Sequence, residues 1–269
     1  MAPESSPTQP SAASRSIKLV SWNVNGFRAV MKKGFCEWME AAKPDILGLQ
    51  ETKLSAEHVS AEMQCAGYTS YWTHAEKKGY SGVAIYTKIP PISVSEGLGI
   101  PEFDREGRVL VAEYPEFVFY TIYYPNGQRS DERLQYKLAF YDAFLEHANA
   151  MRQKGKRLVI CGDVNTAHHP IDLARPKENE KVSGFLPIER AWMDKFVAEG
   201  YVDTFREFNQ NPAEYSWWNM RTRARERNVG WRIDYFFVSD DLRSNLYNAS
   251  IEQAVMGSDH CPVTLELRF

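Results

Sequence analysis

The chain has 269 residues, 43% hydrophobic and 25% charged, which is typical of a soluble globular protein and long enough for one large α/β domain. Its net charge of −3 gives no overall attraction to nucleic acid, so such binding would require a local basic patch. The sequence has no apolar run as long as a membrane span, and residues 1–16 lack the apolar core of a secretory signal. We therefore expect a disordered tail over residues 1–16, rich in Pro, Ser and Ala, and a single domain over residues 17–269.

Short runs rich in β-forming residues alternate with amphipathic segments along the chain. We predict strands at residues 18–22, 83–86, 109–113 and 118–123, and the last two form a hairpin. Hairpins among strand–helix alternations favour mixed rather than purely parallel sheets.

Three segments have helical patterns. Residues 34–42 predict a helix that Pro44 stops. The clearest helix begins near Ser130 and Asp131, and its apolar face is expected to contain Leu134, Leu138, Tyr141, Leu145 and Ala148. A further helix from Pro187 is expected to bury Ala191, Trp192 and Phe196.

The four cysteines are scattered, without a CxxC pair or a Cys/His cluster. This spacing favours buried thiols in a reducing compartment over disulfides or a zinc site.

Four apolar runs lie next to side chains that bind cations or transfer protons. The run at 46–50 precedes Glu51 and the run at 158–162 precedes Asp163, whereas Asp234 stands at the head of the run at 235–238 and the Asp259-His260 pair lies just before the run at 263–267. Carboxylates and amides at strand ends form a site for a hard cation such as Mg²⁺, which prefers oxygen ligands. The pattern therefore points to phosphate chemistry.

Individual members of this set carry different weight. A lone Asp or Asn at a strand end is usually a turn residue, whereas Glu51 is a poor turn former. Asp163 and Asn165 project to the same side of an extended segment, because side chains alternate with period two. A carboxylate such as Asp234 would fix the tautomer of His260 for proton transfer or charge stabilisation.

An internal similarity relates residues 19–25 to residues 158–165, since both are apolar strands ending in Asn or Asp turns. Two such halves facing each other would bring both polar ends to one rim of a sandwich. Strands that end in such turns are common, so the similarity alone is a weak signal. The adjacent His168 and His169 have no nearby carboxylate in sequence except Asp172, and we expect them to be loop residues.

The segment 217–232 carries five arginines against one glutamate, about +4 in a chain of net −3, with tryptophans at both ends. Arginine neutralises phosphates and tryptophan offers an apolar face to a sugar or base, a composition typical of a loop that contacts nucleic acid. The alternative is a solvated loop whose tryptophans anchor the core. The glycine-rich stretches match neither a Walker nor a Rossmann pattern, and no GxSxG elbow occurs.

Taken together, these stretches resemble the exonuclease III-type apurinic/apyrimidinic endonucleases of the endonuclease/exonuclease/phosphatase superfamily. The motifs that carry the resemblance are residues 21–26, 49–53, 79–83, 123–126, 162–168, 171–173, 184–185, 231–235 and 257–260. The resemblance implies an α/β fold, a four-layer sandwich of two mixed β-sheets flanked by helices, like that of deoxyribonuclease I. It also implies Mg²⁺- or Mn²⁺-dependent hydrolysis of duplex DNA on the 5′ side of an abasic residue.

The resemblance further implies roles for individual residues. Catalysis would involve Tyr123, Asp163, Asn165, Asp234 and His260. The metal site would draw on Glu51, Asn23, Asn25, Asp163, Asn165, Asp259 and His260. DNA would be bound by Arg28, Lys33, Tyr80, Asn126, Trp217, Arg221, Arg223, Arg225 and Trp231, with the two tryptophans lining a pocket for an extruded sugar. Several relatives carry Asp where this chain has Asn25, so this chain lacks one potential carboxylate near the metal.

Other functions fit parts of the same pattern. A relative could act mainly as a 3′-exonuclease or 3′-phosphatase, or directly on a damaged base, and a lipid or inositol phosphodiesterase would share the acidic core. A non-catalytic DNA-binding module would tolerate loss of the acidic cluster. We expect a monomer without membrane association, cytoplasmic if prokaryotic and nuclear if eukaryotic, and not secreted.

Overall fold

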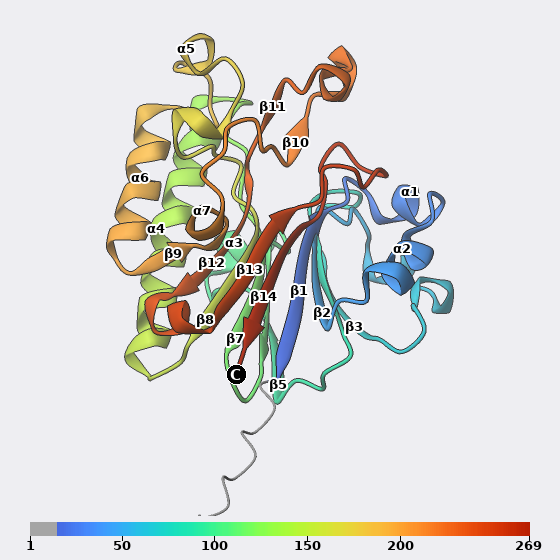
Figure 1. Cartoon of the computed structure of the whole chain (residues 1–269). Coiled ribbons are helices and arrows are strands. Elements are labelled where there is room, and N and C mark those ends of the chain that lie inside the picture. Colours follow the sequence, from blue (N-terminus) through green and yellow to red (C-terminus); the bar gives the residue numbers. More distant parts are fainter. Residues whose placement is uncertain (1–14) are drawn as a thin grey trace, which may run out of the picture.

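The computed structural model describes residues 15–269, in which two six-stranded mixed β-sheets pack face to face with helices on both outer sides (Figure 1). This arrangement confirms the predicted four-layer α/β sandwich. Residues 1–14 of the expected tail lie outside the described residues. The first strand begins at Ser16, so the expected tail boundary at residue 16 lies inside this strand.

The two sheets have similar internal organisation. The first contains, in spatial order, β13 (Leu246–Ile251), β14 (Val263–Arg268), β1 (Ser16–Asn23), β2 (Ile46–Gln50), β4 (Val83–Thr87) and β3 (Thr69–Thr73). The second contains β5 (Ser93–Glu96), β6 (Val109–Glu113), β7 (Val118–Tyr123), β8 (Leu158–Asp163), β12 (Asp234–Ser239) and β9 (Tyr201–Asp203). A separate two-stranded ribbon consists of β10 (Trp217–Trp218) and β11 (Gly230–Trp231).

Helices cover the outer faces of the sandwich. Those of the described chain are α1 (Phe27–Met31), α2 (Phe35–Ala42), α3 (Pro101–Asp104), α4 (Asp131–Gln153), α5 (Pro176–Asn179), α6 (Pro187–Ala198) and α7 (Thr204–Phe208). Short 3₁₀ turns occur at Ala56–His58, Ala61–Met63, Pro170–Asp172, Met220–Thr222, Ala224–Arg227 and Asp240–Asn245. In Figure 1, α1 and α2 flank the first sheet and α4 and α6 flank the second. No helix of residues 15–269 has both the length and the apolar character needed to cross a bilayer.

One parallel strand pair lies at the centre of each sheet. β1 runs parallel to β2, with Asn23 opposite Gln50, and β7 runs parallel to β8, with Tyr123 opposite Asp163. The antiparallel strand β12 begins beside β8, where Asp234 pairs with Asp163. Because parallel strands end at the same edge of a sheet, these polar residues gather at one rim.

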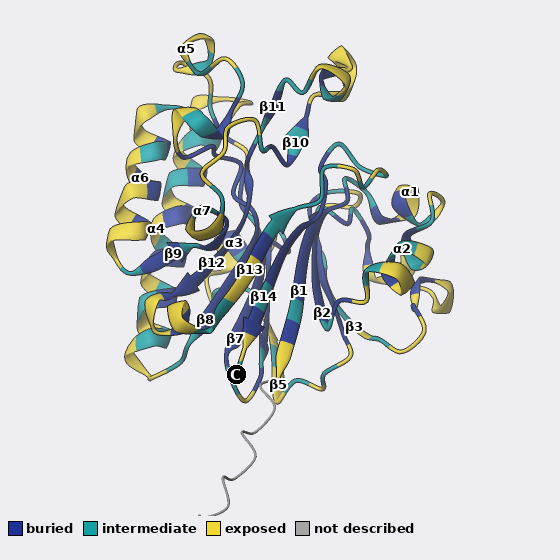
Figure 2. Ribbon diagram, in the orientation of Figure 1, coloured by how far each residue is buried: buried dark blue, intermediate teal, exposed yellow. Residues whose placement is uncertain are grey.

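The core between the sheets explains why the strands carry near-continuous apolar runs. Leu19, Ile85, Phe119, Val159 and Leu265 are buried where the two sheets meet. Figure 2 shows the central strands buried along most of their length, while exposed residues concentrate on the outer helices and loops. Strands covered on both faces are expected to lack polar alternation.

The predicted helices are confirmed, with corrections to their buried faces. Ser130 caps α4 by accepting a hydrogen bond from the backbone N–H of Arg133. Leu134 and Leu138 are only partly buried, and the side chains that pack inward include Lys137, Phe140 and Phe144. In α6, Ala191 is exposed, whereas Trp192, Met193 and Phe196 are buried.

The expectation of four free thiols was wrong for one pair. Cys36 and Cys65 are joined by a disulfide, with their Cα atoms 5.7 Å apart. Their separation of 29 residues carried no sequence signal, because the contact forms only when α2 packs against the loop before β3. Cys161 and Cys261 are buried free thiols, as expected.

Candidate active site

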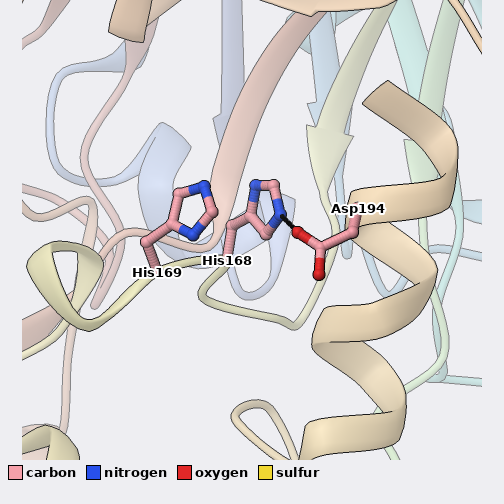
Figure 3. Close-up of side chains that lie close together, drawn as sticks. All are labelled: His168, His169 and Asp194. Atoms are coloured by element: carbon pink, nitrogen blue, oxygen red, sulfur yellow. Dashed lines mark hydrogen bonds and ion pairs between the residues drawn. The ribbon is translucent and has the colours of Figure 1, made fainter. Parts of the chain in front are cut away.

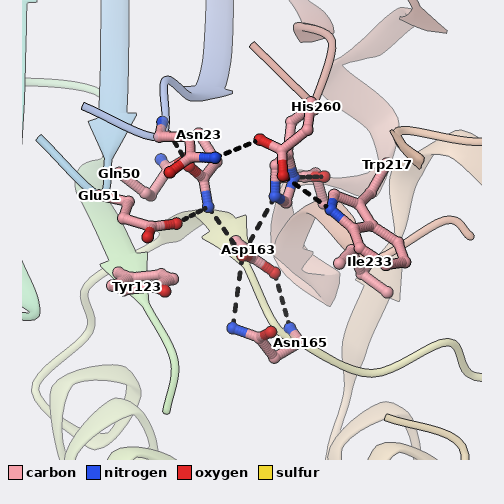
Figure 4. Close-up of polar contacts among 12 residues, drawn as sticks. Asn23, Gln50, Glu51, Tyr123, Asp163, Asn165, Trp217, Ile233 and His260 are labelled. Carbon is pink, nitrogen blue, oxygen red and sulfur yellow. Dashed lines mark hydrogen bonds and ion pairs between the residues drawn. The ribbon is translucent and has the colours of Figure 1, made fainter. Parts of the chain in front are cut away.

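A cavity of about 560 Å³ opens at the rim where the strand ends of the two sheets meet. Its lining includes Asn25, Glu51, Tyr123, Asn126, Asp163, Asn165, Trp217, Trp231, Ile233, Asp259 and His260. Figure 4 shows several of these side chains pointing toward one another from different strands. The structure therefore brings together most of the predicted site residues.

Asn23 connects the acidic groups of the two sheets. Its Nδ2 atom lies 2.9 Å from Asp163 Oδ2 and 3.1 Å from Glu51 Oε2, so one amide donates to both carboxylates. Asn25 Nδ2 donates to Asp259 Oδ1 over 2.9 Å. These contacts join the polar ends of the two internally similar segments.

Three site residues have strained backbone conformations just beyond their strands. Asn25, Glu51 and Asn165 have φ angles of 46°, 54° and 56°, in the left-handed region that residues other than glycine rarely adopt. Such strain clusters at functional sites, where the surrounding structure holds it in place. Here it turns each side chain into the cavity instead of along the strand.

His260 is held by a buried carboxylate. Its Nδ1 atom lies 2.8 Å from Asp234 Oδ2, which also accepts a 2.6 Å hydrogen bond from Ser216 Oγ. Burial alone would lower the pKa of His260, but the Asp234 carboxylate outweighs it and raises the value to about 10. At neutral pH the ring is therefore a cation, and its Nε2 side faces Asp163 at 3.8 Å.

Asp163 lies at the centre of the site. Its Oδ1 accepts the backbone N–H of Asn165 over 2.8 Å. Burial, aided by the Asp234 carboxylate, raises the pKa of Asp163 to about 7 against the attraction of His260. Burial also raises the pKa of Tyr123 well above its usual range, helped by Glu51 and Asp163, so the phenol stays protonated. Asp163 can therefore exchange a proton near neutral pH, and Tyr123 can donate a hydrogen bond.

The oxygen atoms near Glu51 already hold a cationic group. Lys53 Nζ lies 3.0 Å from Glu51 Oε1 and 2.5 Å from Asn25 Oδ1. The Lys53 side chain is 37% exposed, so it can leave this position for solvent. An oxygen-rich set that attracts an ammonium group fits a hard divalent cation, and Glu51, Asn25 and Asp259 are the residues that would hold it. The pattern of Glu51 followed two residues later by Lys53 was visible in the sequence, but its significance was missed.

An aromatic wall borders the acidic centre. Trp217 and Trp231 face each other in the β10–β11 ribbon, with ring centroids 6.4 Å apart and planes nearly perpendicular. Trp217 Nε1 donates to Asp259 Oδ2 over 3.1 Å, so the wall is fixed to the acidic cluster. Ile233, which the sequence analysis did not single out, completes the apolar side of the cavity.

Of the other residues predicted to bind DNA, Asn126 lines the cavity, whereas Arg28, Lys33 and Tyr80 lie outside its lining. Arg28 and Lys33 are exposed near α1, and Lys33 Nζ donates to Gly257 O over 2.7 Å. Tyr80 OH accepts hydrogen bonds from Arg108 and Arg133, neither of which was predicted. Asn126 Nδ2 donates to Asn165 Oδ1 over 2.9 Å, next to Asp163.

The arginines of the 217–232 segment divide into two groups. Arg221 and Arg223 are exposed, although Arg223 forms an ion pair with Glu226. Arg225 donates to the backbone carbonyls of residues 253, 255 and 258, which anchors the loop. Arg232 is fully buried against Asp172 and Asp203. Composition alone could not separate these structural arginines from the exposed ones.

A second group of potential metal ligands lies away from the cavity. His168 and His169 stack at 3.7 Å between ring centroids, and His168 Nε2 lies 2.7 Å from Asp194 Oδ1 (Figure 3). One potential ligand atom from each of the three residues lies within 4.8 Å of the others, but His168 Nε2 already pairs with Asp194. The group therefore ties the loop after β8 to α6, and it supplies the carboxylate that was not apparent near these histidines in sequence.

A rim of buried acids with a cationic histidine, on a two-sheet sandwich, defines the class of metal-assisted phosphoester hydrolases. Residues 20–260 match the model of the Endonuclease/Exonuclease/phosphatase family, and the chain belongs to this family. It is 45% identical over 251 residues to an exodeoxyribonuclease of Bacillus subtilis (strain 168), covering 93% of this chain and 98% of the relative. It is 43% identical to the DNA repair nuclease APEX1 of Danio rerio, covering 93% of this chain and 82% of the relative.

Solved structures with a similar fold include an AP endonuclease. The crystal structure of the AP endonuclease LMAP from Leishmania major matches with a TM-score of 0.86 and 31% identity, covering 95% of this chain and 88% of that one. The resemblance inferred from the sequence motifs is thereby confirmed, and the protein is a DNA-cleaving hydrolase of this family.

Proposed function

We propose that this protein cleaves duplex DNA on the 5′ side of abasic sites, with Mg²⁺ or Mn²⁺, and leaves a 3′-hydroxyl. The observation that carries the proposal is one cavity that the Asp163–His260 pair and the Trp217–Trp231 wall line together, with the Trp217 and His260 rings 6.4 Å apart. A phosphodiester at the polar side would place the adjacent base-free sugar against the apolar side.

The residues divide the chemistry between them. A water oxygen attacks phosphorus, the bond from phosphorus to the 3′ oxygen breaks, and the departing 3′ oxygen takes a proton from solvent. Asp163 positions the water and accepts its proton, since its carboxyl group titrates near neutral pH. Asn165 and Asn126, joined by a hydrogen bond, orient the water and the phosphate.

Charge that develops on the phosphate faces positive groups. His260, fixed by Asp234, presents a cationic N–H toward the phosphate oxygens, and Tyr123 adds a neutral donor. A divalent cation held by Glu51, Asn25 and Asp259 supplies Lewis-acid neutralisation of the phosphate. Arg28, Lys33, Arg221 and Arg223 are exposed and would contact the phosphates that flank the cleaved bond.

A panel of three DNA duplexes tests the proposal: one with an abasic site, one nicked and one with a damaged base. Wild-type protein should incise the abasic duplex fastest, and ethylenediaminetetraacetate should abolish incision. His260→Asn should lower the rate by about 10²–10³-fold, the effect of removing one preorganised charge-stabilising donor. Incision that persists in chelator contradicts the metal assignment, and unchanged activity after His260→Asn contradicts the role of the histidine.

A second candidate comes from the Bacillus subtilis relative, which is named an exodeoxyribonuclease. A faster reaction on the nicked duplex would assign this protein mainly to 3′-end processing. DNA binding without cleavage of any duplex would support the non-catalytic alternative. We further propose that the protein acts as a monomer in the compartment that contains the chromosome.

A further inference from the structure

Helix α4 buries a lysine directly behind the catalytic turn. Lys137 is 0% exposed, and its Nζ atom lies 2.6 Å from Glu189 Oε1, 2.8 Å from Asn165 O and 2.8 Å from Thr166 Oγ1. All three ammonium protons therefore have acceptors, two of them in the turn that follows Asp163.

Glu189 of α6 completes the arrangement from the other side. Its Oε2 accepts the backbone N–H groups of Gly184 at 2.6 Å and Leu186 at 3.0 Å, and its Oε1 accepts Ser183 Oγ at 2.8 Å. The Lys137–Glu189 pair thus links residues 164–166 to residues 183–186 through the interior of the protein.

The second of these segments forms part of the cavity wall. A Cβ atom placed on Gly184 would lie 3.1 Å from the Trp231 ring and 3.2 Å from Asn165 O. In addition, the backbone N–H of Ala167 donates to Gly184 O over 2.8 Å. The aromatic wall, the 183–186 loop and the catalytic turn are therefore in direct contact. The buried Lys137–Glu189 ion pair hydrogen-bonds to both the loop and the turn.

The energetics suggest why the pair is ionic. A buried ion pair stabilises a fold no better than a well-packed apolar pair of similar volume. Apolar side chains, however, cannot donate to the carbonyl of Asn165 or accept from the N–H groups of the 183–186 loop. Asn165 also has a φ of 56°, a conformation that needs external contacts to persist.

We propose that Lys137 and Glu189 are positioning residues that hold the catalytic turn in register with the wall of the sugar pocket. The inference rests on the proposed function, because it presumes that this cavity binds an abasic sugar. The pair does not contact the substrate. It acts by fixing the backbone of Asn165 and Gly184, so that the attacked phosphate and the extruded sugar are placed together.

Four variants of the full chain test this idea: Lys137→Met, Glu189→Gln, the double variant K137M/E189Q, and the control Lys195→Met. Lys195 and Asp142 form an exposed ion pair that also joins α6 to α4, away from the turn, so its loss controls for general loosening between the helices. For each protein, urea unfolding, affinity for the abasic duplex and the single-turnover incision rate are measured.

Each single variant leaves one charge buried without its partner, so both should unfold at lower urea than wild type. The double variant removes both charges and should recover stability above the singles. Its single-turnover rate should nevertheless stay about 10–100-fold below wild type, the cost of misplacing reacting groups by an ångström. Affinity for the duplex should change less than about threefold, since the backbone-binding arginines are untouched. Lys195→Met should behave as wild type.

Recovery of the rate together with stability in the double variant would show a purely structural role and overturn the inference. If the double variant does not fold, Glu189→Gln decides, because it keeps the shape of Glu189, and a wild-type rate would contradict the proposal. Failure of wild-type protein to incise abasic DNA would instead refute the proposed function and is seen in the same assay.

Discussion

Asp163→Asn should abolish cleavage while stabilising the protein. The substitution keeps the size of the side chain but removes its charge and its ability to accept a proton. Loss of a positioned general base lowers rates by about 10²–10⁴-fold. DNA affinity should remain close to wild type, because Asp163 lies at the base of the cavity and contacts protein groups such as Asn23.

The gain in stability follows from the burial of the carboxylate. Asp163 titrates at about 7 in the folded protein, compared with 3.8 ordinarily, which corresponds to roughly 4 kcal/mol at 1.36 kcal/mol per pH unit. Because the folded pKa is raised, this stability is present below pH 4 and is lost as the pH rises toward 7. Asparagine stays neutral throughout, so the variant avoids the loss. The attraction of His260 is already contained in this pKa, but an amide offers only one acceptor oxygen where the carboxylate accepts from both Asn23 and the backbone N–H of Asn165, so we expect a net gain of roughly 2–4 kcal/mol at pH 8.

Thermal and urea unfolding in chelator measure this difference without a contribution from bound metal. A gain of this size should raise the melting temperature by roughly 5–15 °C at pH 8. The two proteins should converge near pH 4, where Asp163 is protonated in both the folded and unfolded chain. A variant that melts below wild type at pH 8, or that cleaves abasic DNA at the wild-type rate, would refute the reasoning.

Three further outcomes are expected. Burial opposes ionisation of Asp172, but the guanidinium group of Arg232 outweighs burial and holds the pKa of Asp172 well below its usual range. Asp172→Asn would leave Arg232 buried without this partner, so it should destabilise the protein by about 3–5 kcal/mol at pH 7. This contribution is present above about pH 4 and is lost as the pH falls toward the folded pKa, so the urea midpoints of variant and wild type should approach each other in acid. Trp231→Ala should weaken binding of abasic DNA by about 1–3 kcal/mol and leave intact duplex unaffected, as a competition assay would show. Replacing Arg221 and Arg223 by alanine should reduce the slope of log K against log salt by about 1–2, and an unchanged slope would exclude both as phosphate contacts.

The sequence predicted the acidic centre because strand ends are readable locally. Glu51, Asp163 and Asp234 each follow or open an apolar run, and parallel pairing places such ends at one rim. Hydrophobic patterning and turn residues therefore identified central strands and the acidic residues at their ends, while the two-sheet sandwich was implied by the resemblance. The resemblance to a known family added the expected roles of these residues.

Contacts that depend on packing between distant elements could not be predicted in the same way. Lys137 falls in an amphipathic helix, where a lysine is usually exposed, and only the positions of Glu189 and Asn165 make its burial favourable. Ser216 supports Asp234 from 18 residues away, and Cys36 meets Cys65 through helix packing. No local pattern encodes these pairs.

The acidity of the rim bears on how this protein binds a polyanion. Glu51, Asp163 and Asp259 line one cavity and would repel a phosphate unless positive charge lies between them. Lys53 already provides one such charge, 3.0 Å from Glu51 and in contact with Asn25 Oδ1, but two of the three donors of its ammonium group are directed to these oxygens. Glu51, Asn25 and Asp259 would hold a divalent cation, which would supply twice the charge of an ammonium group beside the phosphate. An acidic rim of this kind favours a metal-dependent nuclease over a DNA-binding module.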